Sequence, residues 1–352
     1  MEKFKATFLK IIGTVVTFLI FFATLLEVSL SLLIRPCVVV LAKIMRPDLA
    51  EIMHDRGQPF ALESVHTKAG FTIVMHLVCD GTISLDALRQ QFQHQLMPSP
   101  LSKGNSDKYV RLRQIWTQYM GYLFWKWELD FSAKAHIREY DYNEPELAIP
   151  EGVCSEENLK KVTAAIVEKP FAAGQSPWEF LVINKYKSNN NADDHPQCVI
   201  VLRIHHTLAD GISIIKMLLR LFDQEAATFA KARFPEMSLT EKLGRNLKVA
   251  LRAPYALASK LVDGYDGKNR WYIVNRQLPK QYHTFFSDSV PVGKIKEIMR
   301  KHQVCYNAAI YTVTVGAMVK LMKEVGQEVP AQLSCSYPYP LPNHPGGLVN
   351  HA

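Results

Sequence analysis

The stretch "CVIVLRIHHTLADGIS" runs from Cys198 to Ser213 and joins an apolar segment to a second one. Cys198–Ile204 predicts a buried strand, because a short apolar run bounded by polar residues is typical of one. From Gly211 onward, apolar residues recur on one side of a predicted helix. Two adjacent histidines, an aspartate and a glycine stand between them. A strand, a polar loop and a helix together form the arrangement in which α/β folds tend to place chemistry.

The neighbouring segments predict a mixed sheet flanked by helices. Pro177–Ile183 is a second apolar run, and the polar loop between it and Cys198 favours a hairpin. Phe71–Gly81 predicts another strand, followed by a helix with Ser84 as its N-cap. A further helix follows Ser155 and is predicted to end at Pro170. The fold class predicted from these elements is α/β, of the two-layer α+β type.

Two later segments are also predicted to be helical. Residues 238–261 form a basic amphipathic stretch, either a solvated surface helix or linker, or a helix lying on an anionic membrane. Val290–Glu324 predicts two helices with a connection around Tyr306–Asn307, and a strand-like "AQLSCSY" follows.

The N-terminus contains a long apolar segment, "IIGTVVTFLIFFATLLEVSLSLLI", from Ile11 to Ile34, with Glu27 as its only charge. Because about 20 apolar residues cross a bilayer, this segment predicts a transmembrane helix within an anchor at residues 1–47. A buried core helix is the alternative. Cations flank the segment on both sides, so the positive-inside rule gives no orientation. We expect residues 36–65 to be a juxtamembrane connector.

Composition restricts the classes of partner and compartment. The chain has 352 residues, a formal net charge of +8 and 48% hydrophobic residues, which suits an anionic bilayer or a phosphate-bearing ligand. The sequence lacks the basic-aromatic motif of a nucleic-acid module, so we expect no nucleic-acid partner. The cysteines lack zinc or C-x-x-C spacing and are predicted to be mostly buried free thiols in a reducing compartment. They are Cys37, Cys79, Cys154, Cys198, Cys305 and Cys335.

The two histidines allow three interpretations. They could be satisfied turn residues, with Asp210 capping the next helix. They could be metal ligands, but adjacent histidines on a loop point apart and no partner stands at ligand spacing, so we expect no metal. They could supply a general base, which needs a fixed tautomer and orientation. In that case Asp210 would hold the loop, and Gly211, lacking a Cβ, would let a bulky substrate approach.

"HHTLADGIS" resembles the H-H-x-x-x-D-G motif of the CoA-dependent acyltransferase superfamily, most of all the wax ester synthase/diacylglycerol acyltransferase family. "KPFAAGQSPWEFLVI", "MHLVCDGTISLDALRQQF", "LDFSAKAHIREYD" and "CYNAAIYTVTVGAM" are similar to other segments of that family. The similarity extends from about Phe71 to the end of the chain.

The resemblance implies roles for the matching residues. His206 would be the general base, His205 and Asp210 would be structural members of the catalytic motif, and Gly211 would keep the substrate tunnel open. Two more positions would bind substrate. Trp178 matches the Trp of the family's Pro-Leu-Trp motif, and Asn307 matches the Asn of its Asn-Asp pair. Ala308 replaces the aspartate of that pair.

The resemblance also implies a chloramphenicol-acetyltransferase-like fold with two domains. Residues 66–260 would form the N-terminal acyltransferase domain, and residues 261–352 would form only part of the second, ending in the family's Gly-Asn segment, "GGLVNHA".

The implied function is a membrane-anchored O-acyltransferase. It would transfer a fatty acyl group from acyl-CoA, its substrate, to a fatty alcohol or diacylglycerol, with no cofactor. We expect a single-pass protein of the endoplasmic reticulum with a cytosolic catalytic region. The alternative is a catalytically inactive binding or scaffold protein on the same fold, suggested by Ala308 and the short second domain. A weaker alternative is acyl transfer to an amine or a small soluble alcohol.

Overall fold

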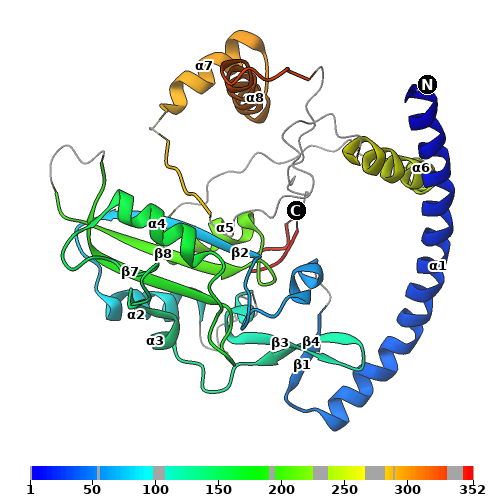
Figure 1. The fold of residues 1–352 in the computed structure, drawn as a ribbon. Helices are drawn as coiled ribbons and strands as arrows, with labels where there is room; N and C mark the ends of the chain where they lie inside the picture. The colour runs from blue at the N-terminus through cyan, green and yellow to red at the C-terminus, as the bar shows by residue number, and fades with distance from the viewer. Residues whose placement is uncertain are drawn as a thin grey trace. The chain divides into compact units, whose positions relative to one another are not determined.

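In a computed structural model of the chain, β8 (Gln197–His205) lies at the centre of the larger sheet (Figure 1). It pairs antiparallel with β2 (Thr72–Asp80) on one side and with β7 (Trp178–Lys187) on the other. The predicted strands and the predicted hairpin are therefore confirmed. β5 (Ile137–Glu139) and β6 (Cys154–Ser155) pair parallel with β7, so the sheet is mixed.

The structure describes residues 2–53, 56–97, 108–189, 195–224, 237–265, 282–287, 290–330 and 344–351. They belong to two compact units. One comprises residues 29–235, 280–285 and 339–352, and contains both sheets. The other comprises residues 1–28, 236–279 and 286–338. The domain division at about residue 260 and the anchor at residues 1–47 remain predictions.

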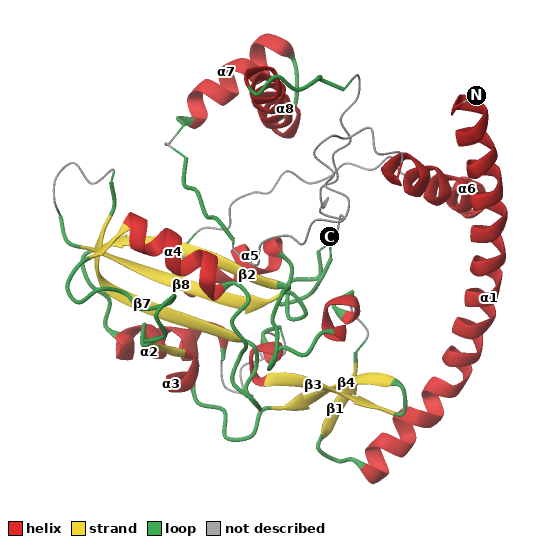
Figure 2. Ribbon diagram, in the orientation of Figure 1, coloured by secondary structure: helices red, strands yellow, loops and turns green. Residues whose placement is uncertain are grey.

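Helices cover both faces of the five-stranded sheet, which confirms the predicted α/β class. Figure 2 shows α4 (Glu156–Ile166) on one face and α2 (Leu85–Leu96) and α3 (Ala133–His136) on the other. α5 (Gly211–Leu221) packs beside α2. The main core lies where α2 and α5 meet the sheet, and burying it is the largest favourable contribution to folding. Fully buried members include Phe92, Phe180, Ile200, Leu202, Ile214 and Met217.

Side-chain caps begin three of these helices, as local sequence rules predict. Ser84 accepts a hydrogen bond from the amide of Ala87. Ser155 forms a capping box with Asn158. The helix that follows ends at Ile166 rather than at the predicted Pro170. Asp210 caps α5 by accepting from the amide of Ser213.

A smaller sheet has the strand order β1 (Leu49–Ile52), β4 (Tyr122–Trp127), β3 (Gln114–Tyr119). Two short 3-10 helices accompany these strands. η1 (Gln58–Leu62) follows β1 in the chain, and η2 (Val110–Arg113) directly precedes β3.

The N-terminal helix is longer than predicted. α1 spans Glu2–Met45, and its portion Thr7–Met45 is long and apolar enough to cross a membrane, with none of its most apolar window buried. The prediction that residues 36–65 form a connector is wrong at its beginning, because residues 36–45 continue the helix through Pro36. They continue because Val38 and Ala42 pack on the smaller sheet, against Ile52 and Phe124.

The second unit contains helices at the predicted places. The basic amphipathic stretch forms α6 (Leu239–Tyr265). α7 (Val292–His302) and α8 (Tyr306–Glu324) meet at a bend of 100°. The bend begins at Gln303, whose φ is 52°, so the connection comes before the predicted Tyr306–Asn307. The segment "AQLSCSY" lies outside the described residues.

The cysteines in the described part of the chain are free, as predicted, although not mostly buried. Cys154 and Cys198 are buried, whereas Cys37 and Cys305 are exposed. Burial raises the pKa of the Cys154 and Cys198 thiols to about 11. Cys335 lies outside the described residues.

Candidate functional site

His205 ends β8 with its side chain fully buried. Its Nδ1 accepts a hydrogen bond from the amide of Thr207 at 3.3 Å, so its hydrogen is on Nε2. That Nε2 donates to Oε1 of Glu63 at 2.6 Å. Burial lowers the pKa of His205, and Glu63 acts in the opposite direction. Because Nδ1 accepts a hydrogen bond, His205 is a neutral ring with both nitrogens bonded, which suits it to hold the loop.

Glu63 ties a second segment of chain to this loop. Its carboxylate accepts from the amides of Gly70 and Phe71 as well as from His205. Glu63 and Phe71 thus bond the chain before β2 to the loop that carries the two histidines. Part of this segment is the predicted connector, and these contacts give it a fixed position.

His206 is half-buried and differs from His205 in its partners. Its amide donates to the carbonyl oxygen of Phe71 at 2.8 Å. Its ring stacks on Phe60, with centroids 4.0 Å apart and planes at 22°. The Nδ1 atom lies 2.9 Å from Oδ1 of Asn350. These contacts fix the plane of the ring from one face and one edge.

Asn350 determines which nitrogen of His206 carries the hydrogen. Its amide nitrogen donates to the carbonyl oxygens of His206 and Thr207, at 2.9 Å and 3.2 Å. Its Oδ1 is therefore the atom that faces His206, and an oxygen there can only accept. Nδ1 of His206 must then donate, which leaves a lone pair on Nε2. No hydrogen-bond partner is recorded for that Nε2 among the described residues.

Asp210 holds the end of the loop and the C-terminal segment together. Oδ1 accepts from the amide of Ser213 at 2.8 Å, and Oδ2 accepts from the amide of His351 at 2.7 Å. The amide of Asp210 donates to the carbonyl oxygen of Val349 at 3.1 Å. The residue is 4% exposed, so its carboxylate is a buried acceptor shared by the start of α5 and the C-terminal segment.

The segment 344–351 is itself held close to the chain around Lys108. The amide of Leu348 donates to the Lys108 carbonyl oxygen at 2.9 Å. A Cβ on Gly347 would lie 2.2 Å from that same oxygen, and φ at Gly347 is 73°, so only glycine fits. His344 accepts from the amide of Gly346 through Nδ1, which places Nε2 for its 3.0 Å bond to Oγ of Ser213.

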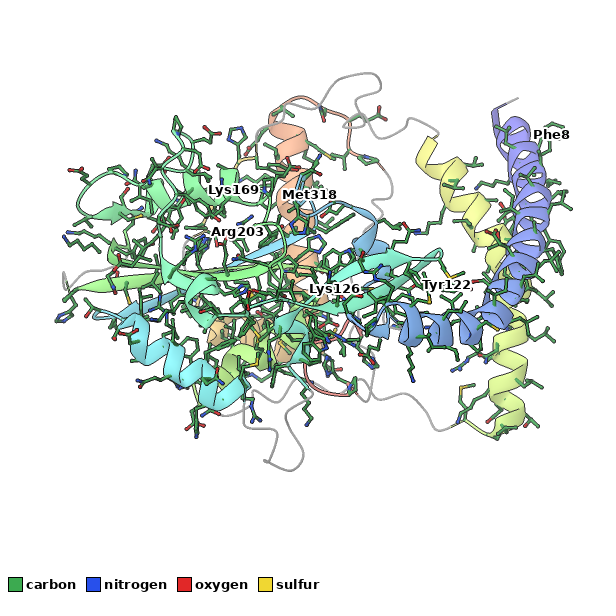
Figure 3. All side chains as sticks on the ribbon, turned by 90° about the horizontal axis from the view of Figure 1, so that it is seen from below. Phe8, Tyr122, Lys126, Lys169, Arg203 and Met318 are labelled. Carbon is green, nitrogen blue, oxygen red and sulfur yellow. The ribbon has the colours of Figure 1, made fainter. Side chains whose placement is uncertain are left out.

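A buried ionic network fixes β8 just before the loop. Arg203 is fully buried, pairs with Glu179 on β7 and donates to the carbonyl oxygen of Lys169. Figure 3 labels Arg203 and Lys169. Arg138 on β5 also pairs with Glu179, at 2.7 Å. Breaking such a pair by removing one partner is strongly destabilising, so this network holds the strand from which His205 projects.

Gly211 and Trp178 occupy opposite environments. Gly211 is exposed at the first turn of α5, and a Cβ placed there would meet nothing within 4 Å. Trp178 is 1% exposed, its ring stacks on His136 and Phe92, and its indole N–H donates to the carbonyl oxygen of Leu112 at 2.7 Å. The substrate-binding role of Trp178 remains a prediction.

His205, His206, Asp210 and Gly211 all lie at the connection from the end of β8 to the start of α5. Asn307 lies in the first turn of α8, which belongs to the other unit, and its role remains a prediction. In the part of the chain that the structure describes, no group of three or more His, Cys, Asp or Glu side chains could hold a metal ion.

Three further residues of the site escaped the sequence reasoning. Phe60 and Glu63 carry no local signal, because neither belongs to a motif. Asn350 stands in the Gly-Asn segment noted in the sequence, and the Gly346–Gly347 pair before it marks a place of close backbone approach.

No protein-family model matches the sequence, and no curated protein matches it. Among solved structures, a similar one is the wax ester synthase/diacylglycerol acyltransferase from Marinobacter aquaeolei VT8. The identity is 13% and the TM-score 0.33, over 56% of this chain and 45% of that chain. It has the name of the family that "HHTLADGIS" resembles.

Two other similar structures come from different proteins. The SgcC5 protein from Streptomyces globisporus is 14% identical, with a TM-score of 0.34, over 74% of this chain and 55% of that chain. The X-domain from teicoplanin biosynthesis is 14% identical, with a TM-score of 0.31, over 64% of this chain and 41% of that chain. The chain spans less than two thirds of the length of each of the three.

Proposed function

We propose that the chain is a membrane-anchored O-acyltransferase that uses His206 as its general base. One observation carries the proposal: Asn350 holds Nδ1 of His206 as a donor, so the Nε2 lone pair is available. A base needs a fixed tautomer and a free lone pair, and His206 is half-buried rather than enclosed.

In the proposed reaction, Nε2 of His206 takes the proton of an acceptor hydroxyl group. The hydroxyl oxygen attacks the thioester carbonyl carbon of acyl-CoA, the new C–O bond forms and the C–S bond breaks. The proton on His206 then passes to the departing CoA sulfur. The sequence has no G-x-S-x-G motif, so the proposal has no acyl-serine intermediate. The proposed transfer involves no cofactor.

The proposed substrates are acyl-CoA and a fatty alcohol or diacylglycerol. This choice rests on the resemblance of "HHTLADGIS" to the wax ester synthase/diacylglycerol acyltransferase family. It is supported by α1, which is long and apolar enough to place the chain at a bilayer, where such acceptors dissolve. We further propose the endoplasmic reticulum as the location, with the catalytic unit in the cytosol.

The test is ester formation from radiolabelled acyl-CoA and hexadecanol or diacylglycerol, measured with the purified full chain in detergent or vesicles. His206→Ala should abolish most of the turnover, while a soluble alcohol or amine should compete poorly for the acyl group. Turnover that is unchanged in His206→Ala would overturn the assignment of the base. A wild-type chain that never turns over acyl-CoA would instead favour a binding or scaffold protein.

A further inference from the structure

The tip of the β3–β4 hairpin has an unusual composition. Tyr119 pairs with Tyr122, so Met120 and Gly121 form a two-residue turn, with φ of 47° and 82°. Such a turn favours Asn or Asp followed by Gly, because those residues tolerate positive φ. Here a methionine takes the strained position and is 55% exposed. This exposed apolar residue in a strained turn makes the tip a candidate contact surface.

The same hairpin is bonded to α1. The Tyr122 hydroxyl donates to the carbonyl oxygen of Ser31 at 2.5 Å and lies 3.1 Å from its Oγ. Figure 3 shows Tyr122 against the helix. Ser31 belongs to the last turn of the apolar segment Ile11–Ile34. The hairpin tip is therefore fixed at the level where the predicted membrane segment ends.

Beyond this level, α1 has two different sides. Val38 and Ala42 are buried against Ile52 and Phe124 of the smaller sheet. The remaining side stays apolar but exposed as far as the end of the helix. Its exposed residues are Leu33, Ile34, Val40, Leu41, Ile44 and Met45. The exposed apolar surface thus continues along the side of α1 that faces away from the smaller sheet.

Aromatic and basic side chains accompany this surface. The Arg46 guanidinium lies 5.8 Å from the centre of the Tyr119 ring. Arg46 and Lys126 both pair with Asp48, at 2.8 Å and 3.4 Å. Lys43 is exposed on the same turns of helix. Tyrosines and cations beside an apolar face are typical of the interface between a bilayer and water.

We propose that α1 residues 31–46 and the hairpin tip 119–122 form one surface that rests on a lipid bilayer. Met120 enters the acyl-chain boundary, and Tyr119 and Tyr122 lie at the headgroup level. The proposal rests on the anchoring of α1 in the proposed function, and extends it. The sheet-bearing unit is held against the bilayer by a packed helix and hairpin.

A lipid bilayer is favoured over a second copy of the chain as the occupant because the surface continues along the same helix from the predicted membrane segment Ile11–Ile34. A protein partner would instead have to cover the exposed apolar residues of α1 between Leu33 and Met45.

The experiment uses the full chain in vesicles of phosphatidylcholine and phosphatidylserine that contain a phospholipid with a diazirine on its acyl chain. After irradiation, mass spectrometry of peptides locates the lipid adducts. We expect adducts in α1 and in the hairpin tip. Met120→Glu should reduce adducts at the hairpin several-fold and leave those in α1. The matched control is Leu129→Glu, which changes an exposed leucine at the other end of β4 and should alter neither.

Adducts in α1 without adducts at the hairpin would overturn this inference while leaving the anchoring intact. Adducts in neither segment would overturn the anchoring and this inference together. Crosslinks between two chains at the hairpin, in place of lipid adducts, would assign the surface to a second copy. His206→Ala should leave the adduct pattern unchanged, so the outcome is independent of the proposed chemistry.

Discussion

His136 and His206 lie near the ends of strands in the same unit, yet their surroundings differ. His136 is 1% exposed and stacks on Trp178, with centroids 4.4 Å apart. Its Nδ1 bonds to the carbonyl oxygen of Trp178 at 2.8 Å, and its Nε2 bonds to Glu128 at 3.0 Å. His206 is half-buried, and within the described part of the chain its ring bonds through Nδ1 alone, to Asn350.

The difference separates a supporting histidine from a candidate base. A ring whose two nitrogens are both occupied can hold neighbouring segments but has no lone pair to offer a substrate. His205, with Thr207 and Glu63 as partners, belongs with His136 in this respect. Only the partners of each ring distinguish these histidines, since the residue type is the same.

The largest effect is expected for His206→Ala. Loss of a general base should reduce turnover by about 10²–10⁴-fold. Stability should change little, because the ring is half-buried and makes few polar contacts. Acyl transfer and thermal unfolding should be measured on the same preparation. A variant that unfolds and loses turnover together would place His206 with the supporting histidines.

Asn350→Ala should have the next largest effect on turnover. Without Oδ1 the ring of His206 can change tautomer and orientation, and displacement of a catalytic group costs up to about 10²-fold. The pH profile of turnover should shift as well, because the hydrogen bond that favours one tautomer is lost. If Asn350→Ala lowers only stability and leaves the profile of the remaining activity unchanged, the tautomer argument fails.

His136→Ala should give the opposite result. It leaves the buried Glu128 carboxylate without its imidazole partner, although the amide of Ser176 still donates to it at 2.8 Å. An unsatisfied buried polar group costs about 1–3 kcal/mol, and the lost ring adds a cavity. Chemical denaturation should show this loss, while turnover per folded molecule stays near that of the wild type. A selective loss of turnover would contradict the comparison.

Stability should also fall as the pH is lowered below about 6.5, the ordinary histidine pKa. Burial lowers the pKa of His205 and of His76, so the folded chain keeps them neutral while the unfolded chain binds protons. For each unit by which folding lowers a histidine pKa, the chain loses about 1.4 kcal/mol of stability once the pH is below the pKa in the folded state. The free energy of unfolding should be measured with denaturant at about pH 7.5 and about pH 5.5. The difference between the two values should be smaller in His205→Gln.

The smallest effect on stability is expected for Gly211→Ala. The added methyl group meets no protein atom within 4 Å, so stability should stay within about 0.5 kcal/mol. Turnover should nevertheless fall, more for long acyl chains than for short ones, if substrate passes this position. Equal rates for all chain lengths would show that substrate does not approach Gly211.

The elements around the site were predictable because their signals are local. Apolar runs predicted β2, β7 and β8, and the residues before two helices favoured caps at Ser84 and Asp210. The end of α1 was not predictable from local rules. Pro36 and the cations after Ile34 favour an end there, but packing on the smaller sheet extends the helix to Met45.

The sequence by itself determined that two histidines follow an apolar strand and that Asp210 stands where the next helix begins. Only the tertiary structure decided what each histidine can do. The partner of His205 is 142 residues away, and the partner of His206 is 144 residues away. No local pattern can specify such contacts, because they depend on how separate segments pack. That packing occupies both nitrogens of the His205 ring, whereas among the described residues only Nδ1 of His206 has a hydrogen-bond partner.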